Sequence, residues 1–203
     1  MKFFNVLSPE YGTNVYFLVG DDNKAVVIDA SDYNLVKSVE KEHAFTVTDC
    51  LLTHGHFDHA GGCAKLQKEG VKIHIHKKDA DKLLGNGNVG YVFGIEFEKL
   101  TPDFTFNGGD VLKINGFEFN VLHTPGHSKG SVCFIINDIL ISGDTLFYES
   151  IGRTDFYDGD YDEIMRSIKL LFDLDKDYLV YPGHGRITKL SHEELYNPFL
   201  REL

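Results

Sequence analysis

The first half of the chain alternates short apolar runs with helical patterns of hydrophobic residues. Residues 14–20 and 25–29 are apolar and rich in β-branched and aromatic side chains, and the polar turn at 21–23 between them predicts a β-hairpin. A helix is predicted next, because Ser31 or Asp32 can cap its N-terminus and apolar residues follow at helical spacing. The same criteria predict strands at residues 45–53 and 71–76, helices at 64–69 and 77–84, and a glycine-rich loop at 86–100.

The second half repeats this theme with stronger turn signals. Asn-Gly at 115–116 and Asn-Asp at 137–138 each separate two apolar runs, so each predicts a hairpin. Asp160 and Glu163 have the spacing of a capping box at the start of a helix. The hairpin strands are expected at residues 111–114, 117–122, 132–136 and 139–142, followed by a buried strand at 178–181 and a helix at 191–197.

The order of these elements predicts an α/β (α+β) fold class. Each half consists of strands followed by a helix, which favours two sheets packed face to face with helices outside. No linker or low-complexity stretch divides the 203 residues. We therefore expect one domain over residues 1–203.

Composition and charge exclude several classes of protein. Acidic residues outnumber basic ones by 31 to 20, and no Lys/Arg run is longer than a pair, so a nucleic-acid partner is not expected. No apolar run approaches the ~20 residues of a membrane helix, and the apolar start at residues 3–7 is too short for a secretory signal. We expect a cytoplasmic protein without a membrane partner. Three distant cysteines do not indicate a disulfide framework.

The chemistry is concentrated in the histidines, of which the chain has ten. Residues 53–59, Thr-His-Gly-His-Phe-Asp-His, directly follow a predicted buried strand. A loop in this position aims its side chains outward from a rigid scaffold. This one short segment, with His54, His56, Asp58 and His59, could therefore supply two ligands to each of two adjacent metal ions.

Three further ligand-type residues follow later predicted strands. His127 lies in Thr-Pro-Gly-His-Ser, Asp144 in Ser-Gly-Asp-Thr and His184 in Tyr-Pro-Gly-His-Gly. Each motif follows a short apolar strand and places a glycine directly before the ligand-type side chain. A lone loop histidine is usually solvated, but this shared arrangement points to metal. Imidazole and carboxylate ligands suit zinc, iron and manganese.

These motifs together resemble the metallo-β-lactamase superfamily of binuclear hydrolases, and the resemblance covers essentially the whole chain. The segments 124–128, 142–147, 152–155 and 181–185 are most similar to the short glyoxalase II-like, or hydroxyacylglutathione hydrolase-like, branch. The resemblance implies a four-layer αββα sandwich with two mixed sheets. It also implies that His54, His56 and His127 hold one metal, that Asp58, His59 and His184 hold the other, and that Asp144 bridges them.

The expected activity is metal-dependent hydrolysis. Two divalent ions, zinc first and iron or manganese as alternatives, share a bridging hydroxide that is nucleophilic near neutral pH. Asp58 is expected to orient this hydroxide as well as to bind metal. The glyoxalase II-like motifs imply a small-molecule acyl thioester such as S-acylglutathione, with S-lactoylglutathione as the type, or an ester. The alternatives are a persulfide dioxygenase-like oxidoreductase with one iron, and a lactone or other ester hydrolase.

Residues outside the ligand set have more open roles. Arg153 is a candidate clamp for a substrate carboxylate, with an ion pair to Asp155 as the alternative. Tyr148 is a candidate pocket residue, with core or surface packing as the alternative. Asp29 is expected to hydrogen-bond the histidine loop. Nineteen residues follow His184, so we expect no helical C-terminal substrate domain of the kind that helps glyoxalase II to bind glutathione. The sequence carries no signal of oligomeric state.

Overall fold

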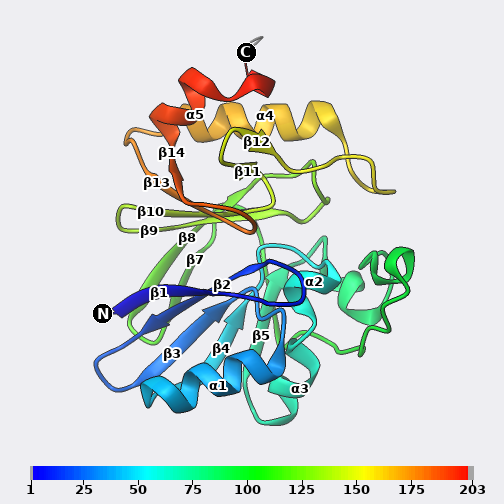
Figure 1. Cartoon of the computed structure of the whole chain (residues 1–203), viewed down its shortest axis with the longest axis vertical. Helices are drawn as coiled ribbons and strands as arrows, with labels where there is room; N and C mark the ends of the chain where they lie inside the picture. Colours follow the sequence, from blue (N-terminus) through cyan, green and yellow to red (C-terminus); the bar gives the residue numbers. More distant parts are fainter. Residues whose placement is uncertain (1, 201–203) are drawn as a thin grey trace.

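Within residues 2–200, which the computed structural model describes, two six-stranded β-sheets face each other (Figure 1). Helices α1 (Tyr33–His43) and α3 (Cys63–Lys68) lie on the outer side of one sheet, and α4 (Tyr161–Phe172) and α5 (Leu190–Tyr196) on the outer side of the other (Figure 1). The layers therefore follow the order helix, sheet, sheet, helix. The predicted αββα fold class is confirmed.

The first sheet has an antiparallel and a parallel part, so it is mixed. Its strands, in spatial order, are β1 (Lys2–Leu7), β2 (Asn14–Val19), β3 (Lys24–Ile28), β4 (Thr46–Leu51), β5 (Lys72–His76) and β6 (Phe104–Phe106). β1, β2 and β3 pair antiparallel, whereas β3 to β6 pair parallel. Because parallel strands end at the same edge of a sheet, the segments after β4 and β5 lie close together.

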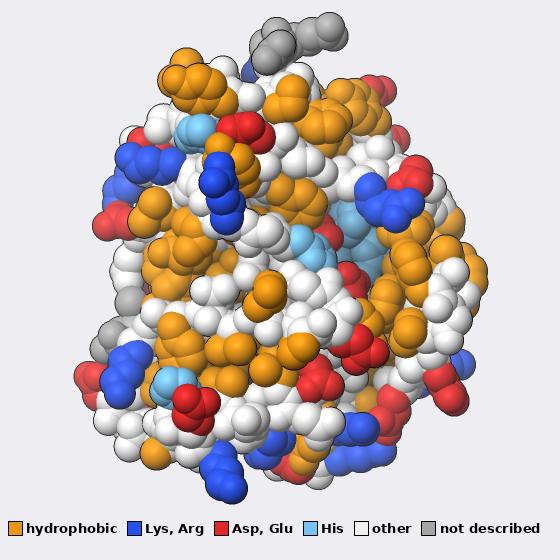
Figure 2. Space-filling view, in the orientation of Figure 1, with side chains coloured by type: hydrophobic (Ala, Val, Ile, Leu, Met, Phe, Trp, Pro, Cys, Tyr) orange, Lys and Arg blue, Asp and Glu red, His pale blue; other side chains and the backbone are white. Residues whose placement is uncertain are grey.

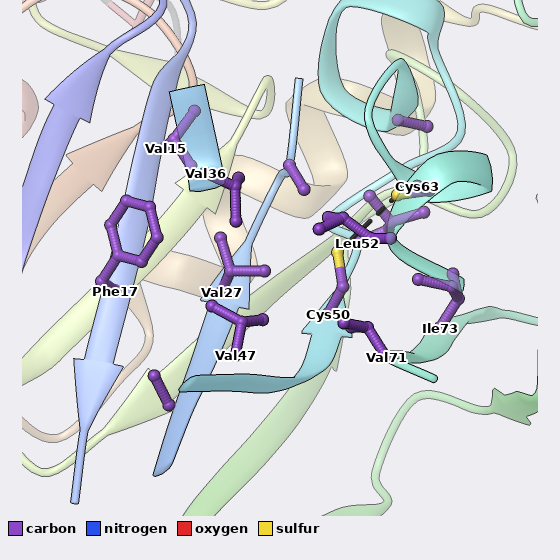
Figure 3. Close-up of a cluster of buried hydrophobic side chains, with 14 of the residues drawn as sticks. Val15, Phe17, Val27, Val36, Val47, Cys50, Leu52, Cys63, Val71 and Ile73 are labelled. Carbon is purple, nitrogen blue, oxygen red and sulfur yellow. Dashed lines mark hydrogen bonds between the residues drawn. The ribbon is translucent and has the colours of Figure 1, made fainter. Parts of the chain in front are cut away.

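The outer face of this sheet forms a hydrophobic cluster with α1 and α3. The Asp32 side chain caps α1 by accepting a hydrogen bond from Leu35 N at 2.5 Å. Val36 of α1 lies beside the strand residues Val15 and Val27, and Cys63 of α3 points toward Cys50 of β4 (Figure 3). Burial of this apolar surface attaches the helices to the sheet.

The second sheet is also mixed. Its strands, in spatial order, are β14 (Thr188–Lys189), β13 (Leu179–Pro182), β10 (Ile139–Gly143), β9 (Val132–Ile136), β8 (Phe117–His123) and β7 (Val111–Ile114). The hairpins at Asn115-Gly116 and Asn137-Asp138 are confirmed. β10 and β13 pair parallel, and the chain between them contains α4, which Asp160 caps through Glu163 N at 2.8 Å. A small hairpin of β11 (Leu146–Phe147) and β12 (Ser150–Ile151) precedes α4.

The two sheets are held together by the inner face of each. Along β2, Val15 and Phe17 belong to the cluster under the helices, while Tyr16 and Leu18 face the second sheet. This alternation follows from the two-residue period of a strand. Phe134 is among the second-sheet residues that meet them. None of the helices in the described part of the chain has the length and apolar character needed to cross a membrane.

Some elements differ from the sequence expectations. β1, β6 and β14 were not predicted; each is an edge strand that forms by pairing with a single neighbouring strand. The helix predicted at 77–84 is instead a short 3-10 helix, Ala80–Leu84, which ends at Gly85 with φ 95°. The expected loop at 86–100 contains one 3-10 turn, Gly90–Phe93.

Candidate metal centre

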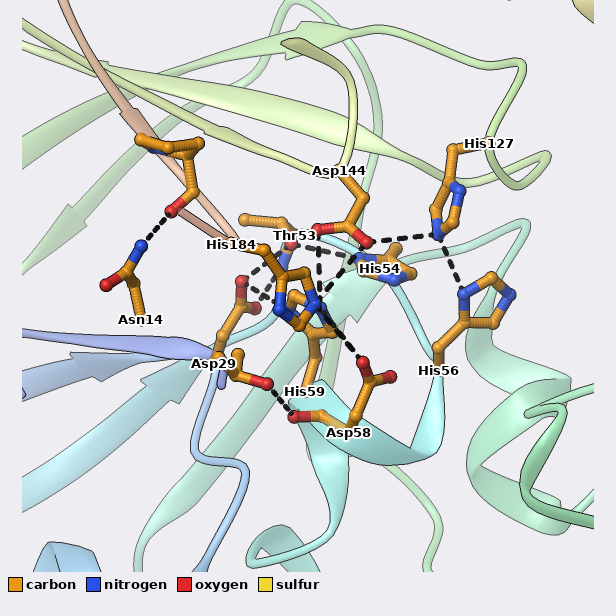
Figure 4. Close-up of polar contacts among 12 residues, drawn as sticks. Asn14, Asp29, Thr53, His54, His56, Asp58, His59, His127, Asp144 and His184 are labelled. Atoms are coloured by element: carbon orange, nitrogen blue, oxygen red, sulfur yellow. Dashed lines mark hydrogen bonds and ion pairs between the residues drawn. The ribbon is translucent and has the colours of Figure 1, made fainter. Parts of the chain in front are cut away.

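The predicted ligand residues converge at the strand ends, where the two sheets meet (Figure 4). The histidine loop follows β4, and α2 (Phe57–Ala60) begins directly after His56, so Asp58 and His59 lie on its first turn. His127 follows β8, Asp144 follows β10, and His184 follows β13.

Glycines allow the later loops to approach this point. Gly126, before His127, has φ +130°, and a Cβ there would lie 2.2 Å from Ile164 N. A Cβ on Gly183, before His184, would lie 2.2 Å from Asp144 Oδ1. The two Pro-Gly-His motifs therefore require glycine for backbone conformation in one case and for close packing in the other.

The first triad consists of His54, His56 and His127. One ring nitrogen from each lies within 4.8 Å of the others. His56 Nδ1 and His127 Nε2 are 2.9 Å apart. All three residues are buried, with exposed fractions of 0, 2 and 3 %. Two nitrogens bound to one tetrahedral zinc lie roughly 3.3 Å apart, so the triad has a spacing suited to a single ion.

The second triad consists of Asp58, His59 and His184, whose ligand atoms also lie within 4.8 Å of one another. His59 Nε2 and His184 Nε2 are 3.3 Å apart, and Asp58 Oδ2 lies 3.3 Å from His184 Nε2. The His59 side chain is fully buried, but 21 % of Asp58 and 29 % of His184 are exposed. This triad contains a carboxylate and is open to solvent on one side.

Asp144 lies between the two triads. Its Oδ1 is 3.4 Å from His59 Nε2, and its Oδ2 is 3.5 Å from His127 Nε2 and 3.7 Å from His184 Nε2. One carboxylate therefore contacts a member of the first triad and two members of the second. This is the position that a bridging ligand occupies.

In four of the five histidines, the ring nitrogen that faces away from the cluster has a hydrogen-bond partner; the exception is His56, whose Nε2 is buried and makes no hydrogen bond with the described part of the chain. Such partners fix the tautomer and orientation of a metal-binding histidine. They are Thr53 Oγ1 for His54 at 3.1 Å, Asp29 Oδ2 for His59 at 3.0 Å, the Arg153 carbonyl oxygen for His127 at 2.8 Å and the Gly12 carbonyl oxygen for His184 at 3.2 Å.

Inside the cluster, some polar atoms have no such partner. His54 Nε2 and Asp144 Oδ1 are buried and make no hydrogen bond with the described part of the chain. A buried polar atom without a partner is costly, and a cation between the imidazoles and carboxylates would remove that cost. The residues therefore fit divalent metal ions, and the donor set of nitrogen and oxygen suits zinc, iron or manganese.

Electrostatics within the cluster also favour metal binding. Burial, together with the imidazoles of His59 and His56, lowers the pKa of His54 well below its usual value. Burial alone would raise the pKa values of Asp58 and Asp144, but neighbouring imidazoles, His59 first, lower both to about 2. His54 is therefore neutral and both carboxylates are ionised at neutral pH, as metal coordination requires.

The pKa of His59 is shifted in the opposite direction to that of His54. Burial alone would lower its pKa, but the carboxylates of Asp144, Asp58 and Asp29 raise it well above the usual value. Among these acidic groups, a metal ion would take the place of the proton on His59 Nε2.

A buried acidic residue that the sequence analysis did not single out, Asp79, ties two ligand loops together. Its Oδ2 accepts hydrogen bonds from Gly55 N at 2.9 Å and Ser128 Oγ at 2.7 Å, and its Oδ1 accepts one from Gly130 N at 2.7 Å. Gly55 separates His54 from His56, and Ser128 follows His127 in the chain. Its position just after a predicted strand was visible in the sequence, but the pairing of that strand with β4, which brings Asp79 to the histidine loop, was not.

A buried lysine balances this negative charge. Lys82 Nζ lies 3.9 Å from Asp79 Oδ1 and donates to Asp158 Oδ2 at 2.5 Å. Burial raises the pKa of Asp79, and Lys82 opposes that shift. The network therefore connects both loops of the first triad to the loop before α4.

The other three predicted residues have different positions. Asp29 accepts hydrogen bonds from Thr53 N and Thr53 Oγ1, both at 2.8 Å, besides its contact with His59. Arg153 lines the cavity beside the cluster, but its guanidinium pairs with Asp155. Tyr148 is not among the described residues that line the cavity, so its predicted contact with substrate stays a prediction. Its ring instead packs beneath the Arg186 guanidinium, 3.3 Å from the ring centre, and stacks on His192.

A cavity of about 530 Å³ opens directly onto the cluster. Its walls include residues of both triads, Asp144, and several aromatic side chains. Histidine side chains are visible in a hollow bordered by hydrophobic side chains (Figure 2). The arrangement can bring a small molecule of mainly apolar character against the candidate metal ligands.

The facing mixed sheets, the outer helices and the His/Asp cluster at the strand ends define a class of αββα proteins with a metal-binding centre. The chain belongs to the metallo-β-lactamase superfamily, whose family model matches residues 9–184. The family inferred from the sequence motifs is thereby confirmed. The chain is a metal-dependent hydrolase of this superfamily.

Known proteins similar to this chain match it over nearly its full length. It is 38 % identical over 194 residues to hydroxyacylglutathione hydrolase GloC of Haemophilus influenzae, which covers 90 % of this chain and 91 % of that protein. The BLEG-1 B3 metallo-β-lactamase structure has a TM-score of 0.92 and 33 % identity, covering 98 % of this chain and 100 % of the other. The structure of TTHA1623 in a di-iron-bound form has a TM-score of 0.87 and 31 % identity, covering 97 % of this chain and 100 % of the other.

Proposed function

We propose that the protein is a binuclear metal-dependent hydrolase of acyl thioesters, with S-acylglutathione thioesters as the first candidates. The observation that carries the proposal is the pair of triads that share Asp144 at the base of one cavity. The similarity to a hydroxyacylglutathione hydrolase supports the thioester as substrate.

In this proposal each triad holds one metal ion and Asp144 contacts both. His54, His56 and His127 would hold the first ion, and Asp58, His59 and His184 the second. Bound together, two divalent cations would supply a hydroxide at neutral pH and polarise the substrate carbonyl. Zinc is the first candidate, with iron or manganese as alternatives, and the di-iron-bound form of TTHA1623 supports iron among them.

The chain's own residues would position the reactants. Asp58 lines the cavity and is ionised at neutral pH, so it can accept a hydrogen bond from the attacking water and orient it. Phe57 and Phe156 line the same cavity and exclude bulk water from the carbonyl. His127 and His184, fastened through their other ring nitrogens, keep the far side of the cavity rigid.

The test is thioester hydrolysis by metal-loaded protein compared with the Asp58→Ala and His184→Ala variants. We expect two metal equivalents in the parent protein, and a loss of activity of roughly a thousandfold in either variant. Activity no higher than in the variants would contradict the proposal. One iron per chain, with rapid oxygen uptake on a persulfide, would favour the oxidoreductase alternative. A lactone and a β-lactam in the same assay test the other hydrolase alternatives.

A further inference from the structure

We infer that the cavity is an acyl-binding site that selects neutral aromatic or alkyl acyl groups over small hydroxylated ones such as lactoyl. This inference rests on the proposed function for its catalytic consequence. It concerns the part of the substrate that lies beside the metal centre, and it depends on the walls of the cavity instead of on the metal ligands.

The walls are dominated by apolar side chains. Apart from both triads and Asp144, nine described residues line the cavity, and seven of them are apolar or aromatic. Sites of this composition bind ligands mainly by burying apolar surface. The seven are Tyr11, Phe57, Val89, Phe93, Phe147, Ile151 and Phe156.

The aromatic residues form a continuous wall that reaches the centre. Ring centroids are 5.3 Å apart for Tyr11 and Phe57, 5.5 Å for Phe57 and Phe93, and 6.5 Å for Phe93 and Phe156. Phe156 meets the His56 ring edge-on at 5.6 Å. An acyl group whose carbonyl lies at the centre would therefore lie along aromatic faces and edges, the geometry that aromatic rings favour.

Phe93 is the wall residue with the most apolar surface still to bury. It is 54 % exposed although it lines the cavity, and it ends the short turn Gly90–Phe93. An aromatic acyl group lying against it would remove apolar area from water on both partners. A lactoyl group would offer little apolar area and would place a hydroxyl against phenylalanine side chains.

The charges in the cavity oppose an anionic acyl group. Arg153 is the one Lys or Arg among the described lining residues, and its guanidinium makes two 2.6 Å hydrogen bonds with Asp155. The same guanidinium stacks on Phe156 at 4.1 Å. The other charged wall residue, Glu10, is acidic. A negatively charged acyl group would find no unpaired cationic side chain on the wall and would face Glu10.

The decisive experiment compares S-phenylacetylglutathione with S-lactoylglutathione, two thioesters that share their thiol. We expect kcat/KM of the metal-loaded enzyme to be at least about tenfold higher for the phenylacetyl substrate. Phe93→Ala should reduce that ratio several-fold, mainly through KM for the aromatic substrate. Phe104→Ala is the matched control, because Phe104 is also 54 % exposed but does not line the cavity. It should leave the ratio unchanged.

Binding of two neutral amides separates this inference from the proposed function. In an NMR titration, phenylacetamide should bind the metal-loaded protein at least about tenfold more tightly than lactamide, and Phe93→Ala should weaken it. Thioester hydrolysis without a phenylacetyl preference would overturn the inference and leave the proposed function standing. Absence of hydrolysis, with phenylacetamide still bound at Phe93, would overturn the function and leave the binding site standing. Equal binding of both amides would overturn the inference.

Discussion

The two triads of the candidate centre look equivalent in the sequence but are built differently. The first triad is made of three imidazoles and is almost completely buried. The second includes the Asp58 carboxylate, and 29 % of the His184 side chain is exposed. Both triads contribute residues to the cavity, but a cation in the first would be held by buried side chains, whereas one in the second would be held partly by side chains that solvent reaches. We therefore expect a metal ion in the first triad to exchange slowly and one in the second to exchange more readily.

The triads also differ in what holds them. Asp79 ties the two loops of the first triad together through buried hydrogen bonds. The second triad is fastened by the turn between β1 and β2, where Thr13 Oγ1 donates to the Asp58 carbonyl oxygen at 2.8 Å and Asn14 N donates to the Gly183 carbonyl oxygen at 2.7 Å. Ligands of the same chemistry are therefore supported by unrelated parts of the chain.

Replacing Asp144, the carboxylate that faces both triads, should have the largest effect, because both triads lose a charge. Asp144→Asn removes the charge that faces both, so we expect at most one tightly bound metal and a loss of hydrolysis of roughly a thousandfold. Elemental analysis and kcat/KM measure the two effects. Asp138→Asn is the control, since Asp138 forms an exposed ion pair with Lys176 far from the cluster. Two bound metals in Asp144→Asn would show that Asp144 is not a bridging ligand.

Replacing Asp79 should weaken the first triad selectively. Asp79 accepts hydrogen bonds through both of its carboxylate oxygens, from Gly55 N, Ser128 Oγ and Gly130 N. In Asp79→Asn one of these oxygens becomes an NH₂ donor, so at least one of the three hydrogen bonds is lost. Loss of such a supporting contact typically costs about 10- to 100-fold in metal affinity.

Calorimetric titration in two backgrounds assigns this effect to one triad. With His184→Ala, where only the first triad is complete, Asp79→Asn should weaken metal binding. With His127→Ala, where only the second is complete, it should have little effect, because the hydrogen bonds of Asp79 go to the loops of the first triad. Equal losses in both backgrounds would mean that Asp79 acts on the fold as a whole.

The rate of metal removal by a chelator compares the two triads directly in the parent protein. A chelator in excess is expected to release the two ions in separate phases, the second-triad ion first, because Asp58 and His184 are exposed and the first triad is not. A colorimetric chelator records both phases. His184→Ala should lack the fast phase. A single phase in the parent protein would argue against unequal access.

The smallest effect is expected from the side chain of Arg153. Its carbonyl oxygen, not its guanidinium, holds His127, and the pair with Asp155 is exposed. Exposed ion pairs contribute little to stability because solvent screens them. Arg153→Met should therefore keep two metals and leave the midpoint of urea unfolding almost unchanged. Loss of a metal in Arg153→Met would show that the side chain also supports the first triad.

Features with local signals were predictable from the sequence. Asn115-Gly116 specifies its hairpin through the left-handed conformation of both residues, and Asp160 specifies a helix start through its own side chain. The 53–59 segment and the later strand-end residues could likewise be identified as one ligand set, because a repeated pattern of strand, glycine and ligand is visible in the sequence.

Features that depend on distant partners were not predictable in the same way. Asp79 contacts groups 24, 49 and 51 residues away, and nothing in its neighbours distinguishes it from a surface aspartate. The helix expected at 77–84, which would have included Asp79, is a 3-10 helix over Ala80–Leu84 in the structure. The contacts of Tyr148 with Arg186 and His192 were not predictable for the same reason, because both partners come from a later segment.

His184 contacts the turn before β2, so one of the first segments to be synthesised is joined to one of the last. The ligands of the first triad have all been translated once His127 leaves the ribosome, whereas the second triad waits for His184, 57 residues later. At roughly 5–20 residues per second this delay is roughly 3–11 s. Until then, the contacts that Gly12 and Thr13 make with His184, which follows a strand of the second sheet, cannot form. All three ligands of the first triad are therefore synthesised before the second triad has its last ligand.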